Sequence, residues 1–213
     1  MFKRLVFTYF VFINSVFLGF SQLPIEKLHQ GDIIFQELNC GSLCESIAKV
    51  TPSKDGYLFT HAGLILKKDG EIMVIEAIGT QVQCTRIEDF IKRTAFSKKK
   101  GIAVARFKSS AKAKKASLAA ELALNYLGIP YDNAFLPDGS ALYCTELIQL
   151  VFRKVGLGEA IKSKPMTFKD PETGQILEDW QKYYDELNLK VPEGLMGTNP
   201  GRLSLYRGFK FIY

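Results

Sequence analysis

Four cysteines and two histidines are the residues of this 213-residue sequence best suited to nucleophilic chemistry. Cys144 is the strongest candidate, because it opens an apolar segment with helical spacing and follows a turn-rich loop. The thiolate is the reactive form of cysteine, and the free amides and dipole of a helix N-terminus favour that charge. We therefore expect Cys144 to be a nucleophile. The alternative is a small core residue, as most cysteines on apolar helices are.

A cysteine nucleophile needs a base, and the two histidines differ in their surroundings. His29 lies in a polar segment, whereas His61 directly precedes the apolar run 62–66. Glu76 is an acid inside a second apolar run, and a hairpin joining the two runs would bring it within reach of His61. Such a carboxylate fixes the tautomer of the base and stabilises its charged form. The alternative for Glu76 is a solvent-facing position on an edge strand.

The segments around these residues predict an antiparallel sheet, in part a β-meander, with helices packed on it. Asp69-Gly70 between two apolar runs is the clearest hairpin signal. Strands are expected at 33–35, 62–66, 72–78, 82–86, 102–107 and 204–213. Helices are expected at 43–50, 87–93, 110–127, 144–155 and 178–187, with an otherwise irregular tail from residue 162 onward. The fold class is therefore α+β.

Composition is that of an ordinary globular protein, with 47% hydrophobic and 23% charged residues. Residues 22–213 show no internal repeat and are expected to form one domain. The formal net charge is +6, and lysines gather at 98–100 and at 112–115. They indicate a loop and the exposed side of a helix, without the interleaved aromatics of a nucleic-acid site. We expect no nucleic-acid binding; an anionic envelope surface is a better partner for this charge.

Residues 1–21 have the pattern of an export signal. Lys3 and Arg4 precede an apolar stretch that ends in small residues before Gln22. The stretch is short for a membrane-spanning helix, although a retained N-terminal anchor is the alternative. We therefore expect an exported protein, periplasmic or extracellular.

The remaining cysteines, Cys40, Cys44 and Cys84, could form disulfides in an oxidising compartment. Four cysteines allow three complete pairings, and spacing alone does not choose among them. A bond between Cys144 and any other cysteine would block its chemistry. The sequence has no CxxC pair and only two histidines, so no structural metal is expected. Nothing in the predicted chemistry needs an organic cofactor.

Four segments taken together resemble the YiiX/YebB-like hydrolases, which are circularly permuted relatives of the NlpC-type cysteine peptidases. They are GDIIF at 31–35, HAGLI at 61–65, VIEA at 74–77 and YCTELI at 143–148. The segment 194–204 is also similar to the C-terminal part of that group. No single segment would be specific, but their number and order are.

The resemblance implies a permuted papain-like fold in which the strand with the base precedes the helix with the nucleophile. It implies that Cys144 is the nucleophile, His61 the base and Glu76 the third polar group. NlpC-type relatives commonly use a second histidine where this sequence has Glu76, and a carboxylate adds charge there. Residues expected to bind the substrate are Tyr131, which could also polarise its carbonyl, and the neighbours of the nucleophile, Tyr143 and Thr145.

The predicted activity is therefore hydrolysis of amide bonds through a thioacyl-enzyme, with no metal or organic cofactor. Small peptides, such as fragments of the cell wall, are the first substrate class. A lipid-directed thiol hydrolase or acyltransferase is the alternative enzyme, because related folds act on lipid esters. A non-catalytic binding protein with a papain-like cleft is the alternative outside enzymes. The sequence leaves substrate and oligomeric state open.

Overall fold

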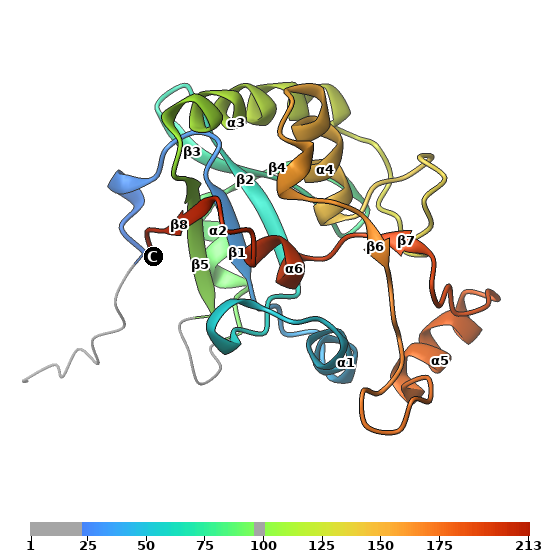
Figure 1. Ribbon diagram of the computed structural model, residues 1–213. Coiled ribbons are helices and arrows are strands. Elements are labelled where there is room, and N and C mark those ends of the chain that lie inside the picture. Colours follow the sequence, from blue (N-terminus) through green and yellow to red (C-terminus); the bar gives the residue numbers. More distant parts are fainter. Residues whose placement is uncertain (1–22, 96–100) are drawn as a thin grey trace, which may run out of the picture.

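The computed structural model describes residues 23–95 and 101–213. Its centre is a six-stranded sheet with the order β4-β3-β2-β1-β5-β8, in which all neighbouring strands are antiparallel (Figure 1). The strands are β1 Ile33–Gln36, β2 His61–Lys68, β3 Glu71–Ile78, β4 Gln81–Arg86, β5 Ile102–Phe107 and β8 Phe209–Phe211. The sheet and its helices confirm the expected α+β class.

The hairpin between β2 and β3 turns at Asp69 and Gly70, as the sequence predicts. Their φ angles are 51° and 80°, and a two-residue hairpin turn of this hand needs positive φ at both positions. The turn fixes the register, in which Leu64 pairs with Ile75. Extending this register one step places Gly63 opposite Glu76, which matters for the site described below.

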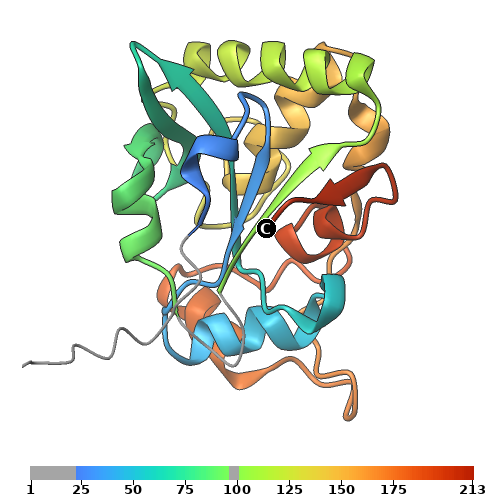
Figure 2. The same cartoon turned by 90° about the vertical axis from the view of Figure 1, so that its left-hand side faces the viewer.

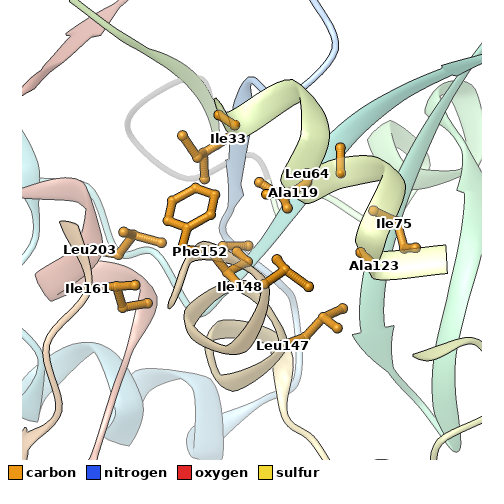
Figure 3. Close-up of a cluster of buried hydrophobic side chains, with 14 of the residues drawn as sticks. Ile33, Leu64, Ile75, Ala119, Ala123, Leu147, Ile148, Phe152, Ile161 and Leu203 are labelled. Carbon is orange, nitrogen blue, oxygen red and sulfur yellow. The ribbon is translucent and has the colours of Figure 1, made fainter. Parts of the chain in front are cut away.

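Each face of the sheet is covered by helices, because neighbouring residues of a strand point to opposite sides. α3 (Ser110–Ala123) and α4 (Cys144–Lys154) cover one face and pack on Leu64 and Ile75 (Figure 3). α2 (Ile87–Lys92) contributes Phe90 to the apolar cluster on the other face, which includes Val74. Both views of the molecule place α3 and α1 (Ser42–Val50) at opposite ends of the strands (Figures 1 and 2).

α3 approaches the sheet closely because its buried residues are all alanines, at positions 116, 119, 120 and 123. A Cβ atom on Gly31 would lie 2.4 Å from the backbone of Ala116, so only glycine fits where β1 begins. The helix was expected to reach residue 127. Its α-helical part ends at Ala123, and one 3-10 turn, Leu124–Tyr126, continues it before Gly128.

The C-terminal region differs most from the expectation of an irregular tail. α5 (Glu178–Glu186) is present as expected, but β6 (Lys164–Pro165) and β7 (Met196–Gly197) also pair as a small second sheet. The last strand was predicted over 204–213 and covers only β8, because α6 (Pro200–Ser204) and a turn occupy the segment before it. Such short elements are set by capping rather than by periodicity: the Asn199 side chain accepts the Arg202 N–H.

α5 belongs to a further hydrophobic cluster, rich in aromatic residues, that packs against α1 away from the two faces of the sheet. Phe168, Trp180 and Tyr184 are buried in it. Ser46 on α1 donates a 2.9 Å hydrogen bond to Asp179 on α5. The other described elements are single 3-10 turns at Ile25–Lys27, Lys54–Gly56 and Gly158–Ala160.

Cys40 and Cys44 form a disulfide where α1 begins, while Cys84 and Cys144 are free thiols. In the described ranges no helix has the length and apolarity needed to cross a bilayer. The expected export signal, residues 1–21, and the lysine run 98–100 lie outside the described residues.

Candidate active site

His61 and Glu76 meet on one face of the β2–β3 hairpin. His61 lies two residues before Gly63, and Gly63 is opposite Glu76, so the two side chains are diagonal neighbours. A Cβ atom on Gly63 would lie 3.3 Å from the Glu76 Cβ and 2.4 Å from Val74. The absence of a side chain at residue 63 therefore lets the imidazole reach the carboxylate. His61 Nε2 lies 2.5 Å from Glu76 Oε2, and both side chains are buried.

The second oxygen of Glu76 has two donors of its own. The Thr85 hydroxyl on β4 donates to Oε1 at 2.5 Å, and Arg93 Nη2 at the end of α2 donates to the same atom at 2.6 Å. Burial alone would raise the pKa of the Glu76 carboxyl, but the hydrogen bond and charge of His61, followed by the Arg93 charge, hold it below its usual value. Glu76 is therefore an ionised acceptor for His61.

His61 is held between Glu76 and Cys144. Burial acts to lower the pKa of His61, but its side-chain hydrogen bonds to Cys144 and Glu76 outweigh burial and raise the pKa to about 9. Because Glu76 uses Nε2, the ring nitrogen left for the Cys144 thiol is Nδ1. The Phe90 ring packs beside the imidazole, with 5.9 Å between the two ring centres. The guanidinium carbon of Arg93 lies 5.1 Å from the centre of the same Phe90 ring. These contacts hold the imidazole in one orientation.

Cys144 is the first residue of α4, as the sequence predicts. The first bonds of the helix run from the N–H groups of Glu146 and Leu147 to the Tyr143 carbonyl. The amides of Cys144 and Thr145 precede these bonds, in the position where a helix N-terminus stabilises negative charge. Cys144 is 5% exposed, and that exposure opens into a cleft.

The residues beside the nucleophile hold a distant loop in place. The Tyr143 hydroxyl accepts the N–H of Thr198 at 2.9 Å, and the Thr198 hydroxyl donates to Thr145 at 2.9 Å. Burial raises the pKa of Tyr143 to about 12, so its hydroxyl stays protonated. Both residues line the cleft, but the hydroxyls with which they would bind a substrate already have partners.

Tyr131 also lines the cleft. Burial, and then the negative charge of Cys144, raise the pKa of this phenol well above its usual value. A neutral Tyr131 keeps a proton that it can donate toward the space beside the thiol. The structure thus brings all six residues singled out by the sequence to one cleft or directly behind it, with His61 and Glu76 behind Cys144.

Glu146 is a titratable neighbour that the sequence reasoning missed. Burial, and then the charge of Asp132, raise the pKa of the Glu146 carboxyl to about 7. A carboxyl that is about half protonated near pH 7 repels a thiolate two residues away less than an ordinary glutamate would. No pattern marks it, since glutamate in the first turn of a helix is common.

The walls of the cleft are mainly apolar and come from four separate parts of the chain. α1 supplies one wall, the loop after Tyr131 a second, the β6–α5 region a third and α6 the last. The side chains include Ile47, Val50, Phe135, Met166, Phe168, Trp180, Pro200 and Arg202. The space measures about 690 Å³ when the part open to solvent is included. Sequence reasoning named none of these wall residues as part of a site.

The order of the elements, with a buried His–Glu pair on one hairpin and a cysteine at a later helix start, defines a permuted papain-like thiol hydrolase. A family model described as "Permuted papain-like amidase enzyme, YaeF/YiiX, C92 family" matches residues 27–206, and the chain belongs to this family. The resemblance and the enzyme class inferred from the sequence are thereby confirmed. The protein is a hydrolase of the cysteine amidase type.

Two relatives are similar over most of their length. The uncharacterised protein YiiX of Escherichia coli strain K12 is 27% identical over 152 residues, which are 70% of this chain and 71% of that protein. The crystal structure of YiiX from Escherichia coli O157:H7 matches with a TM-score of 0.69 at 20% identity, covering 87% of this chain and 96% of the other. The structural match supports the fold.

That second relative is described as a metalloprotein. Within residues 23–95 and 101–213 of this chain, no group of three or more His, Cys, Asp or Glu side chains is placed to hold a metal ion. The residues around Cys144 therefore do not fit a metal centre, and the chemistry derived below involves none.

Proposed function

We propose that Cys144, His61 and Glu76 hydrolyse amide bonds through a thioacyl-enzyme. The Cys144 thiolate attacks the carbonyl carbon and forms a C–S bond. His61 then gives its proton to the departing nitrogen as the C–N bond breaks. Water next attacks the thioester, its proton passes to His61, and the carboxylic acid leaves as the thiolate is restored. Glu76 keeps the imidazole oriented and stabilises its charged form throughout.

The main support for this proposal is that one buried imidazole, that of His61, interacts with both Glu76 and Cys144. His61 Nε2 lies 2.5 Å from Glu76 Oε2, and interactions with both Cys144 and Glu76 raise the pKa of the imidazole to about 9. At neutral pH the imidazole is charged and can hold a thiolate beside it, which is the activated state of a cysteine hydrolase. The Cys144 amide at the helix start, with the Tyr131 hydroxyl, offers donors for the oxyanion.

The activated thiolate is testable against a cysteine in the same protein. Cys84 is a free, half-buried thiol whose pKa is raised by burial, so it is a matched unactivated control. Labelling with iodoacetamide at pH 7 should modify Cys144 at least about tenfold faster than Cys84, because only the thiolate reacts. Peptide mass spectrometry of wild type, Cys144→Ser and Cys84→Ser separates the two sites. Equal rates would contradict the proposal.

For the substrate we propose amides of small peptides, cell-wall fragments among them. The second candidate is a lipid acyl group, and a specific observation favours it: Phe135, Met166, Phe168 and Trp180 form an apolar wall beside Cys144. Turnover of muropeptides and of N-acylated and O-acylated lipids should be compared between wild type and Cys144→Ala. Cleavage of one class that depends on Cys144 decides between the candidates. A lack of any Cys144-dependent cleavage would instead favour a binding protein.

A further inference from the structure

A second hollow lies next to the catalytic cleft, between the segment 159–164 and α6. Its floor is apolar, since Ile161 and Leu203 belong to the main core and lie beside Phe152 (Figure 3). Its rim is basic, with four cationic side chains and one acid, Glu159. The cations are Lys162, Lys164, Arg202 and Arg207. We call this hollow the basic groove.

The charge of the basic groove is not neutralised by the protein. Lys112 lies 2.9 Å from the Glu159 carboxylate and lowers its pKa, so the one acid on the rim is already paired. Over the described ranges, none of the four rim cations has an acidic side chain within ion-pair distance. Four like charges around one hollow repel one another and raise the local concentration of anions.

The basic groove and the catalytic cleft share a wall. Thr198, Asn199 and Arg202 line both spaces. Thr198 is tied by hydrogen bonds to Tyr143 and Thr145, the two residues that flank Cys144. The Asn199 side chain caps α6 at the N–H of Arg202. The backbone of Arg202 is therefore held near the nucleophile, and its side chain lines the boundary between an apolar and a basic space.

We propose that the basic groove binds an anionic group of the substrate, a carboxylate or a phosphate, close to the amide that Cys144 attacks. Arg202 would be the first cation to contact this group, because it lines both the cleft and the groove. Its guanidinium can give two parallel hydrogen bonds to either anion. Lys162, Lys164 and Arg207 add positive charge farther along the groove. The substrate is then an amide with an apolar part in the cleft and an anion in the groove. This inference rests on the proposed amide hydrolysis.

Matched amides that differ only in charge test the groove. The probes are an N-acyl glycine, an N-acyl aminomethylphosphonate and the neutral N-acyl glycinamide, each made with an N-acetylphenylalanyl and with a decanoyl acyl group. Released amine gives kcat/KM for the wild type, and calorimetry gives Kd for the uncleaving Cys144→Ser variant. We expect both anions to be preferred over the neutral amide by at least about tenfold. The better of carboxylate and phosphonate identifies the anion, and the better acyl group identifies the apolar part.

Two variants assign the preference to the groove. In Arg202→Gln, the preference for the anionic over the neutral probe in kcat/KM and in binding should fall about tenfold. In the exposed double variant Lys162→Gln/Lys164→Gln, the same preference should fall about threefold. Lys67→Gln, an exposed lysine of β2, is the matched control and should leave the ratio unchanged. The preference should weaken in 0.5 M salt.

The outcomes separate this inference from the activity on which it rests. Anion-selective binding to Cys144→Ser without turnover by the wild type would support the groove and overturn the proposed hydrolysis. Turnover or binding with no charge preference, or a preference that survives both groove variants, would overturn the groove alone.

Discussion

Asp32 and Glu76 are both buried carboxylates with an arginine partner, and the use of their oxygens differs. Arg106 donates to both Asp32 oxygens, at 2.6 and 2.7 Å, and the His29 N–H adds a third bond. On Glu76, Arg93 and Thr85 both donate to Oε1, and Oε2 is hydrogen-bonded to His61 alone. The two acids have almost the same burial, 1% and 0% exposed.

The difference lies in the partner that can change its charge. Every hydrogen bond to the Asp32 carboxylate comes from a donor whose charge does not change, and the pair with Arg106 ties the residue before β1 to β5. Glu76 keeps one oxygen for an imidazole, which can gain and lose a proton. A buried acid–arginine pair is thus a structural tie when it is complete, and a support for chemistry when one oxygen is left for histidine.

Replacing Glu76 should have a larger effect on activity than any other substitution considered for the two acids. In Glu76→Gln, Arg93 and Thr85 should keep the amide oxygen at their side and turn the NH2 group toward His61 Nε2. That arrangement cannot stabilise the imidazolium, and kcat on any cleaved amide should fall about 1,000-fold. Steady-state kinetics with a circular-dichroism check of folding measures it. A loss of less than tenfold in a folded variant would contradict the role of Glu76.

Asp32→Asn should show the opposite pattern, with a large loss of folding stability and no change in kcat. Arg106, whose side chain is only 16% exposed, would lose its counter-charge. The free energy of unfolding should fall by about 3 kcal/mol, measured by urea denaturation. The kcat per folded molecule should stay within twofold of wild type. A lower kcat in the folded fraction would show that Asp32 also supports the site.

The stability of the His61–Glu76 pair should depend on pH in a defined window. The pKa of His61 is raised from 6.5 to about 9 in the folded state, so its contribution is complete below pH 6.5 and is lost as pH rises through about 9. The stability gap between wild type and Glu76→Gln should therefore shrink between pH 6 and pH 10, by on the order of 2 kcal/mol. Urea denaturation across this range gives the gap. A gap that widens would reverse the sign of the coupling.

Replacing Arg93, the arginine partner of Glu76, should have a modest effect on activity. Arg93 is 29% exposed in its side chain, so removing its charge in Arg93→Met should lower kcat by about fivefold. Loss of this cation also favours a charged His61, and the alkaline limb of the kcat–pH profile should move to higher pH. Arg93→Lys should restore most of both. An unchanged pH profile in Arg93→Met would limit Arg93 to a packing role.

The parts of the site that could be predicted are those that depend on short stretches of chain. The Asp69-Gly70 turn sets the β2–β3 register, and the register alone brings His61 and Glu76 together. The apolar spacing after residue 144 was likewise enough to place Cys144 at a helix start. These features arise from local periodicity and turn chemistry.

The remaining parts depend on contacts between distant segments, which one sequence does not encode in a readable pattern. Arg93 is one of many basic residues, and only the position of α2 over the sheet directs it to Glu76. Phe168 and Trp180 become walls of the cleft because α5 packs on α1 through Asp179. α6 is five residues long and too short to show a helical period.

The disulfide at the start of α1 bears on which partners remain for the Cys144 thiol. Cys40 and Cys44 are four residues apart, and a short loop gives two thiols a high effective concentration for each other. Cys144 lies about a hundred residues away along the chain, so its capture by either thiol must compete with a much faster local reaction. In an oxidising compartment, early pairing of Cys40 with Cys44 would remove two of the three thiols that could capture Cys144, so that only Cys84 remains.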